Sequence, residues 1–474
     1  MKKAIIITLI AIAAISGAVF AYVKCDLHIA FIDNYAQNFS DNLFNLRLQY
    51  EMRKAEKEEE KMLAEGTAAD NADNIKNGEQ DSSASETQSS LSTENAEETE
   101  LVTDEEDSKV ENIAVPGKHE ISSKESVKIV KTQKKSENGE SIDVLTKKLV
   151  NTRDPIAFVE ASKAKYEKFR NGILCASENQ LVLFEKNGNA KFTLSTSISN
   201  PILKVSNPFI LIWESDSNKA VVYENNKEIY TISTADKILT GYISSMGECV
   251  LVTSKPYYKG EVKVYNKSGE EIFSRSFGSE SVLSAAISDS RKLAVSLLLV
   301  NSQANSKVAF FDINKTEEES NIIYENTIIY DLEFYDNSLI AYADNKMISL
   351  KSNGKEDWVY SYNERTLNHC SKDNKDIRLL IFDNLNNAEL TSISLNGKEQ
   401  QRISTDIIPN CGDICDGYII FNSERNLYLS RLDGTLLSKY AASRDIHKAY
   451  FIDSDNILIV YNSSIEFLHI EKGE

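Results

Sequence analysis

The feature that most constrains the fold is an internal repeat of about 40 residues, a period typical of solenoids and propellers. The repeat runs through residues 154–474, and each copy contains one short run rich in Ile, Val, Leu, Phe and Tyr. Turns rich in Asn, Gly, Asp, Ser and Lys separate the predicted strands. The eight apolar runs are GILCAS (172–177), PFILIWE (208–214), ECVLVTS (248–254), KLAVSLLLV (292–300), SLIAYAD (338–344), RLLIFD (378–383), GYIIFN (417–422) and NILIVY (456–461).

Each apolar run is followed by a second strand with alternating polar and apolar residues, such as QLVLFEKNG (180–188). Six of these eight second strands close on a glycine, which supplies the positive φ of a hairpin turn. A third strand follows, such as AKFTLS (190–195), and a fourth opens the next copy, as in VLSAAIS (282–288) and IIYDLEF (328–334). Four antiparallel strands per copy predict an all-β propeller of eight blades, with seven blades as the near alternative.

Two other all-β folds compete with the propeller. A β-solenoid requires shorter and more regular coils, and a β-sandwich produces no self-similarity at a period of about 40 residues. The last copy shows only two of its strands, so we expect a strand from the preceding linker, residues 126–153, to complete the final blade and close the ring. SVKIVKTQ (126–133) is the segment we expect to do so.

An uncharged run of 20 residues, Ala4–Val23, is long enough to cross a bilayer as a helix. Lys2 and Lys3 precede it, so the positive-inside rule predicts a cytoplasmic N-terminus and an extracytoplasmic C-terminal domain. The alternative is a cleaved signal peptide, because Val19-Phe20-Ala21 is an acceptable cleavage site. We favour a single-pass anchor within residues 1–25, since the apolar part of a signal peptide usually spans about 7–15 residues.

Residues 26–66 are predicted to form a juxtamembrane helix. Apolar residues recur there at spacings of three and four, which places them in one stripe along a helix: Ile32, Tyr35, Phe39, Leu43, Leu46 and Tyr50. The stripe could pair two chains into a homodimer as a coiled coil, or it could lie on the membrane or on the downstream domain.

Residues 67–125 are predicted to be a disordered acidic linker. Between residues 67 and 112, fourteen Asp or Glu stand against two Lys, so this tract alone contributes −12 to the net charge of −19. It has too little apolar surface to offset the entropy of ordering the chain. Such an acidic chain excludes a nucleic-acid-binding function, because phosphates are bound by clustered Lys and Arg.

Two segments carry a resemblance to known propellers. AAISDSRKLAVS (285–296) resembles the strand–turn–strand signature of WD40-like repeats, and SLIAYADNKMISLKSNGKEDWVYSY (338–362) resembles a repeat of the quinoprotein-like propellers. In the latter, a Gly-Lys pair precedes a Trp that docks neighbouring blades. Trp358 matches this Trp, and its aromatic counterparts in other copies are Phe192, Tyr230 and Phe273.

The whole arrangement is similar to an uncharacterised bacterial family with one N-terminal membrane span, an acidic linker and an extracytoplasmic propeller. The resemblance implies a fold rather than an activity. The quinoprotein dehydrogenases of this general fold hold their cofactor with an adjacent Cys–Cys pair, and the sequence has no such pair. It also lacks a G-x-S-x-G elbow and a Walker A loop, and His119-Glu120 has no second His at the zincin spacing. We therefore predict no catalytic, cofactor-binding or metal-binding residue and no cofactor.

Two cysteine-containing groups are the strongest polar candidates. Cys411 and Cys415 could form a disulfide or supply half of a zinc site, but we expect them to stay unpaired. His369 and Cys370 could face the central channel, but we expect them to be a buried pair that is adjacent by chance and has no functional role. Cys175 and Cys249 occupy matching places in apolar runs and are predicted to be core residues: small, apolar and buried.

One loop carries adjacent aromatic residues, KPYYKG at residues 255–260. Tyr257 and Tyr258 in such a loop could anchor a ligand or partner. The alternative, which we favour, is a hairpin tip that packs on itself.

From the fold we expect a binding or scaffolding module at the outer face of the cell membrane, with a protein or a cell-wall polymer as its partner. The alternative is an extracytoplasmic hydrolase or lyase with carboxylates gathered at the mouth of the propeller channel. Charged residues that converge there from several innermost strands would favour the enzyme.

Overall fold

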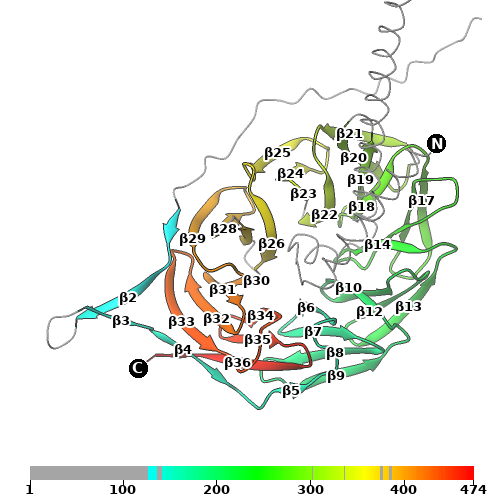
Figure 1. The fold of residues 1–474 in the computed structure, drawn as a ribbon. Helices are drawn as coiled ribbons and strands as arrows, with labels where there is room; N and C mark the ends of the chain where they lie inside the picture. The colour runs from blue at the N-terminus through cyan, green and yellow to red at the C-terminus, as the bar shows by residue number, and fades with distance from the viewer. Residues whose placement is uncertain are drawn as a thin grey trace, which may run out of the picture. The chain divides into compact units, whose positions relative to one another are not determined.

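The computed structural model describes residues 126–135, 141–300, 303–315, 317–335, 337–373, 377–383 and 387–473. These residues form strands and turns without a helix, and eight antiparallel sheets are arranged in a ring around a central channel (Figure 1). The prediction of an eight-bladed all-β propeller is confirmed. Each blade contributes one innermost strand to the channel, and the following strands succeed one another toward the rim.

The first four blades follow the chain in order. Blade 1 contains β6 (Lys165–Phe169), β7 (Gly172–Ser177), β8 (Gln180–Glu185) and β9 (Ala190–Ser195), and blade 2 contains β10 (Pro201–Ser206), β11 (Phe209–Glu214), β12 (Lys219–Glu224) and β13 (Lys227–Ser233). Blade 3 contains β14 (Ile238–Ile243), β15 (Cys249–Thr253), β16 (Gly260–Tyr265) and β17 (Glu271–Phe277), and blade 4 contains β18 (Ser281–Ile287), β19 (Lys292–Val300), β20 (Ala304–Asp312) and β21 (Glu318–Tyr324).

The last four blades complete the ring, and three of them gain strands from the beginning of the described chain. Blade 5 contains β22 (Ile329–Tyr335), β23 (Ser338–Ala343), β24 (Lys346–Lys351) and β25 (Glu356–Ser361), and blade 6 contains β26 (Thr366–Lys372), β27 (Ile377–Asp383), β28 (Ala388–Ser394) and β29 (Glu399–Thr405). Blade 7 contains β30 (Cys411–Cys415), β31 (Tyr418–Ser423), β32 (Asn426–Arg431) and β33 (Thr435–Ala441), and blade 8 contains β34 (Lys448–Asp453), β35 (Asn456–Val460) and β36 (Ser464–Lys472).

The eight apolar runs form the second strand of each blade. These strands are buried on both faces because a neighbouring blade covers each side, so their sequences show no polar alternation. The outer strands alternate between less and more exposed residues, as β9 does. The core therefore lies between the blades, where clusters of buried apolar side chains join one blade to the next.

Aromatic residues of the outermost strands dock neighbouring blades, as the resemblance implied. Trp358 on β25 is 5% exposed, and its Nε1 donates a hydrogen bond of 2.9 Å to the carbonyl oxygen of Leu395 in blade 6. The Tyr230 ring on β13 lies over the β16–β17 turn of blade 3. Gly269 in this turn has a φ of +82°, and a Cβ there would lie 2.8 Å from the Tyr230 ring. Glycine thus provides both the turn conformation and the docking space.

The ring is closed by a strand other than the expected one. β4 (Lys147–Asn151) pairs antiparallel with β36 and supplies the fourth strand of blade 8, and β5 (Ile156–Ala157) extends this pairing. Residues 126–133 do not complete the last blade. β1 (Val127–Lys128) lies parallel to β29, and β2 (Val130–Lys135) lies parallel to β33.

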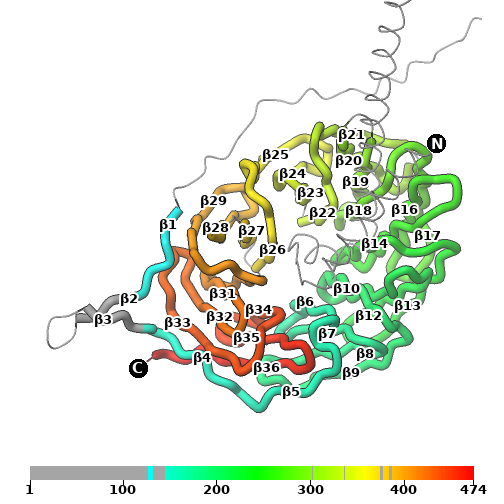
Figure 2. The backbone as a smooth tube through the Cα atoms, viewed as in Figure 1, coloured from blue at the N-terminus to red at the C-terminus, as the bar shows by residue number. Residues whose placement is uncertain are grey.

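The N-terminal strands act together as a clasp, here defined as β1 to β5. β2 turns back into β3 (Ser141–Val144) before the chain reaches β4. Figure 2 shows β1 beside β29 of blade 6 and β4 beside β36 of blade 8, and β2 pairs with β33 of blade 7 between them. Three consecutive blades are therefore tied together by one segment.

The predicted anchor in residues 1–25, the juxtamembrane helix in residues 26–66 and the acidic linker in residues 67–125 lie outside the described residues, as do His28 and His119. Within the described part of the chain, no helix has the length and apolar character needed to span a membrane.

Leu149→Ala should lower the free energy of unfolding by about 2–4 kcal/mol, because it opens a cavity in a core. Leu149 on β4 is 7% exposed and belongs to the apolar cluster that joins blades 7 and 8. Val130→Ala on β2 is the matched control, since Val130 is 54% exposed and its truncation should cost about 0.5 kcal/mol or less. Urea-induced unfolding of the full chain measures both. Equal losses would contradict ring closure through β4.

Candidate functional site

The central channel holds a cavity of about 630 Å³ that is lined by residues of all eight innermost strands and their adjoining loops. This volume is in the range of small-molecule binding sites. The lining loops join first to second strands, as at Asn207, Asp289 and Asp373. The cavity therefore opens on the face of the ring where these loops lie.

The register of the blades brings charged residues to one level of the channel. All innermost strands run in the same direction along the channel. The position compared here is the residue of the innermost strand that pairs with the third residue of the second strand in the same blade. The pairs are Glu167 with Leu174, Lys204 with Leu211, Glu333 with Ile340 and Asp413 with Ile420. Four blades thus place a charge at the same height, which explains how residues far apart in the sequence come together.

Two ion pairs brace the channel between blades that are not neighbours. Lys204 Nζ of blade 2 lies 3.4 Å from Asp331 Oδ2 of blade 5, and burial of the ammonium is outweighed by Asp331, so the pKa of Lys204 is raised. Lys168 Nζ of blade 1 lies 2.8 Å from Asp413 Oδ2 of blade 7. Asp413 also accepts a hydrogen bond of 2.8 Å from the Phe451 backbone N–H of blade 8. These contacts hold the innermost strands at fixed distances.

Glu333 is the centre of a third group of charges in the channel. It forms ion pairs with Lys372 and Arg378 of blade 6, and the Tyr342 hydroxyl donates to its Oε2 at 3.0 Å. Arg378 Nε donates to the Tyr342 hydroxyl at 2.8 Å, so Tyr342 links both charges. Burial opposes ionisation of Glu333, but Lys372 and Arg378 outweigh it and lower the pKa of Glu333 to about 2.

Three polar groups of the cavity contrast with these satisfied pairs. Among the described residues, the Lys165 ammonium, the Glu167 carboxylate and the Tyr450 hydroxyl have no hydrogen-bond or ion-pair partner. Burial lowers the pKa of Lys165 and raises that of Glu167, although Lys204 and Lys372 act against the rise. Because these groups line the cavity and none of them is matched, they are the groups that a ligand in the cavity can bind.

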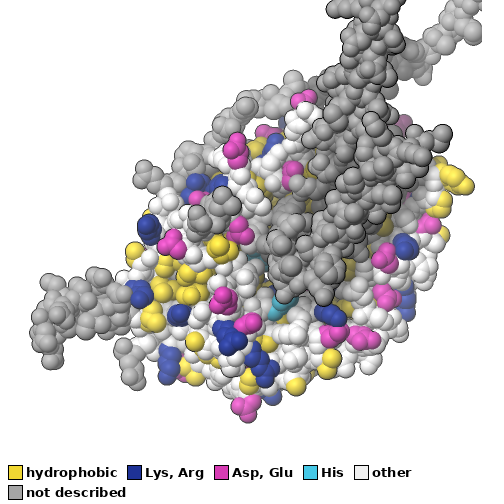
Figure 3. Space-filling view, in the orientation of Figure 1, with side chains coloured by type: hydrophobic (Ala, Val, Ile, Leu, Met, Phe, Trp, Pro, Cys, Tyr) yellow, Lys and Arg dark blue, Asp and Glu magenta, His cyan; other side chains and the backbone are white. Residues whose placement is uncertain are grey.

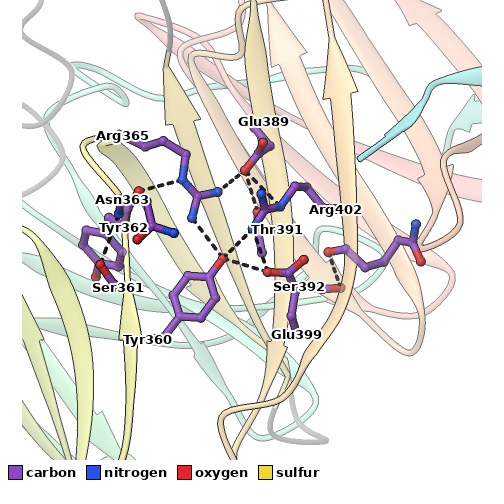
Figure 4. Close-up of polar contacts among 11 residues, drawn as sticks. Tyr360, Ser361, Tyr362, Asn363, Arg365, Glu389, Thr391, Ser392, Glu399 and Arg402 are labelled. Carbon is purple, nitrogen blue, oxygen red and sulfur yellow. Dashed lines mark hydrogen bonds and ion pairs between the residues drawn. The ribbon is translucent and has the colours of Figure 1, made fainter. Parts of the chain in front are cut away.

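A second polar cluster joins blades 5 and 6 and lies outside the channel (Figure 4). The Tyr360 hydroxyl donates to Glu399 Oε2 at 3.0 Å, and Arg402 Nη2 donates to the same carboxylate at 2.8 Å. Arg365 and Arg402 both pair with Glu389. Two guanidinium groups thus balance two carboxylates, and the Glu399 side chain is 1% exposed. We interpret this cluster as a contact between blades rather than a ligand site.

The structure places His369 and Cys370 on innermost strand β26, where both line the cavity. Burial lowers the pKa of His369 to about 4, while a hydrogen bond with the Gly412 backbone acts in the opposite direction. Burial also raises the pKa of the Cys370 thiol to about 12. Burial thus favours the uncharged form of both side chains, the neutral imidazole and the protonated thiol.

Cys411 and Cys415 on β30 are both free thiols. Cys175 on β7 and Cys249 on β15 are also free, and both are buried, as predicted. Cys411 Sγ donates to the Asn422 side-chain oxygen at 2.8 Å. Within the described ranges, no group of three or more His, Cys, Asp or Glu side chains is arranged to hold a metal ion.

The aromatic loop lies between β15 and β16, at the opposite end of the ring from the cavity mouth, because consecutive loops of a blade alternate between the two faces. Tyr258 is 47% exposed and lies under the Lys255 ammonium, 5.1 Å from ring centroid to Nζ. Tyr257 is fully exposed. Within this loop, Tyr258 packs against Lys255, whereas Tyr257 points into solvent. The loop does not line the channel cavity.

Sequence reasoning missed the charged cavity residues, although a signal was present. The strands that open each copy carry charges within otherwise apolar surroundings, as in KYEKF (165–169), PILKVS (201–206) and IYDLEFY (329–335). A charge inside a strand that is buried by neighbours on both sides must face a channel or a partner. The convergence of these charges on several innermost strands is the condition that favours the enzyme alternative.

One face of the ring carries charged side chains of both signs. In the face drawn in Figure 3, Lys and Arg side chains are intermixed with Asp and Glu over the coloured residues.

The closed ring of eight blades, with its lined channel, defines an eight-bladed β-propeller. The C-terminal WD40 domain of Sif2 is similar in structure, with a TM-score of 0.51 and 12% sequence identity, covering 69% of this chain and 99% of that chain. BamB from Moraxella catarrhalis matches with a TM-score of 0.45 and 9% identity, covering 68% of this chain and 100% of that chain.

Residues 144–470 match the family of unknown function DUF5711, and the chain belongs to this family. The matched range contains both β4 and β36 apart from the last two residues of β36, so it includes the ring closure and leaves out β1 and β2. No curated protein matches the chain.

Glu333→Gln should lower the free energy of unfolding at pH 7 by on the order of 3 kcal/mol, since it leaves Lys372 and Arg378 without their counter-charge. The pKa of Glu333 falls from 4.5 to about 2 on folding. Its contribution is therefore complete above pH 4.5 and is lost as the pH falls toward 2.

Urea-induced unfolding of the full chain between pH 7 and pH 2 tests this. The difference between wild type and Glu333→Gln should shrink through that window and vanish at its acid end. Glu178→Gln, in an exposed turn of blade 1, is the control and should match wild type throughout. A Glu333→Gln deficit that is equal at both ends of the range would contradict the assignment.

Proposed function

We propose that the chain is a membrane-anchored binding or scaffolding module whose propeller presents a rigid, loop-lined face to a protein or cell-wall polymer. The observation that carries the proposal is the braced channel, in which Lys204–Asp331 and Lys168–Asp413 fix the innermost strands across the ring. A surface held in one geometry loses little entropy on binding, which favours recognition of large partners. The WD40-like fold supports the same class of function by analogy alone.

We further propose that Ala4–Val23 anchors the chain, with the propeller on the extracytoplasmic side. The length of this uncharged run and the two preceding lysines support this orientation. The acidic tract of residues 67–112 would then extend by self-repulsion and hold the propeller away from the bilayer.

Membrane-impermeant maleimide labelling of a Lys163→Cys variant tests the orientation. The Lys163 side chain is 73% exposed, whereas the cysteines of the described chain are buried or half-buried, so wild type supplies the background. Labelling in intact cells is the expected result. Labelling that occurs only after lysis would place the propeller in the cytoplasm and overturn this part of the proposal.

Crosslinked capture from membranes tests the binding role. The full chain is compared with a chain that ends at residue 125, which removes the clasp and the ring together. A partner retained only by the full chain supports a propeller-based scaffold. Equal retention by both chains would assign binding to the N-terminal segment and contradict the proposal.

An extracytoplasmic hydrolase or lyase is the second candidate, and one observation favours it. Glu167 of β6 and Glu333 of β22 line the same cavity, and their surroundings move their pKa values apart, upward for Glu167 and to about 2 for Glu333. Such a separation is typical of carboxylates that serve as acid and base. In this mechanism Glu167 would donate the proton, and Glu333 would stay ionised.

Incubation of the captured partner or polymer with the full chain tests the enzyme. Bond cleavage followed by mass spectrometry should be abolished by Glu167→Gln while capture persists, because the amide cannot donate a proton. Absence of products with the wild-type chain would reject the enzyme function and leave the binding module.

A further inference from the structure

Two opposite charges on strand β6 stand in the channel cavity without partners. Lys165 and Glu167 are two residues apart, and alternate residues of a strand point to the same side. Both line the cavity, and among the described residues neither forms an ion pair or a side-chain hydrogen bond. They are therefore available to a ligand, in contrast to Lys168, Lys204 and Glu333, whose charges are already matched.

The charge balance of the cavity limits the class of ligand. Its lining contains five lysines and six Asp or Glu residues. Nearly equal numbers of opposite charges give little attraction for a polyanion or a polycation. A molecule with no net charge and one charge of each sign can instead pair with both free groups at once.

We propose that the channel cavity binds a small zwitterion, with the ligand ammonium at Glu167 and the ligand carboxylate at Lys165. The inference rests on the proposed binding function and names the chemistry of its ligand. Each free group then gains a charge-assisted hydrogen bond, the strong kind in proteins. The Tyr450 hydroxyl of blade 8, which has no partner among the described residues, lies close enough to Glu167 for the carboxylate charge to act on it. This hydroxyl can form a hydrogen bond with the polar middle of the same ligand.

The spacing of the two residues points to a short peptide rather than a single amino acid. Residues two apart in a strand are separated by about 6.6 Å along the chain. An extended dipeptide spans about 7 Å between its ends. The cavity of about 630 Å³ has room for a ligand of this size together with bridging water.

Titration calorimetry on the full chain in detergent tests the proposal with glycine, glycylglycine and triglycine at millimolar concentration. Glycylglycine should bind best. N-acetyl-glycylglycine lacks the ammonium and glycylglycine amide lacks the carboxylate, so each should bind about tenfold or more weakly. Absence of binding heat with glycine, glycylglycine and triglycine alike, or equal affinity for the blocked forms, overturns the proposal.

Two variants assign the partners within the cavity. Glu167→Gln should remove the difference between glycylglycine and its N-acetyl form, and Lys165→Met should remove the difference between glycylglycine and its amide. Lys163→Met, at an exposed position outside the cavity, is the matched control and should bind like wild type. Variants that retain both differences contradict the assignment, and thermal unfolding checks that each is folded.

The calorimetric test of the zwitterion and the capture test of the binding role can fail independently of each other. A partner captured by the full chain together with no glycylglycine binding rejects the zwitterion alone. If Glu167→Gln fails to fold, the blocked ligands measured on the wild-type chain still decide the question.

Discussion

The pairing of β4 with β36 is the interaction on which the rest of the structure depends. In a propeller each blade keeps a short edge only at its rim strand, and β4 supplies this rim strand for blade 8 from the other end of the chain, more than three hundred residues from β36. Closing so long a loop costs only about 0.6 kcal/mol more for each doubling of its length. The apolar contacts of Leu149 with the core of blades 7 and 8 and the backbone pairing offset that cost. Without the closure, blade 8 would present the free edge of β36.

The channel is a consequence of this closure. Once the ring is fixed, charges that are isolated in the sequence meet across the channel, and pairs such as Lys204–Asp331 connect blades on different sides. Most of these charges form ion pairs with one another, and these pairs hold the innermost strands rigidly in place. Lys165, Glu167 and Tyr450 stand out because the ring brings them into the same cavity without satisfying them. The candidate site thus consists of the channel side chains that take no part in the ion pairs between blades.

The blades could be predicted from the sequence because their signals are local. Apolar runs, hairpin glycines and the docking aromatic Trp358 repeat with a fixed period, and each works within one blade or with its neighbour. β4 escaped recognition because KKLVN is short and polar, with Leu149 as its main buried anchor. Residues 126–133 look more like a strand, and they do form β1 and the start of β2, but these strands pair in parallel with the rim strands of blades 6 and 7. Only the three-dimensional path of the chain distinguishes the two segments.

The candidate site was predicted even less well. Glu167 and Lys204 belong to different copies of the repeat, and their proximity depends on the register and curvature of the whole ring. His369 and Cys370 attracted notice because of their residue types, yet burial holds them in the neutral form. Motif searches look for reactive residue types, whereas this cavity is lined by ordinary lysines and carboxylates. What singles out the candidate site is that a few of these charged groups have no partner, and the sequence does not show which ones.

Hydrogen exchange followed by mass spectrometry tests the central claim, closure of the ring by β4, most directly. The amides of residues 147–151 that are hydrogen-bonded to β36 should exchange as slowly as those of β36, since they open only when the ring opens. Amides of β1, which pairs through two residues at the rim, should exchange much faster. Fast exchange of residues 147–151 in a chain whose blades stay protected would show that β4 does not close the ring and would contradict this account.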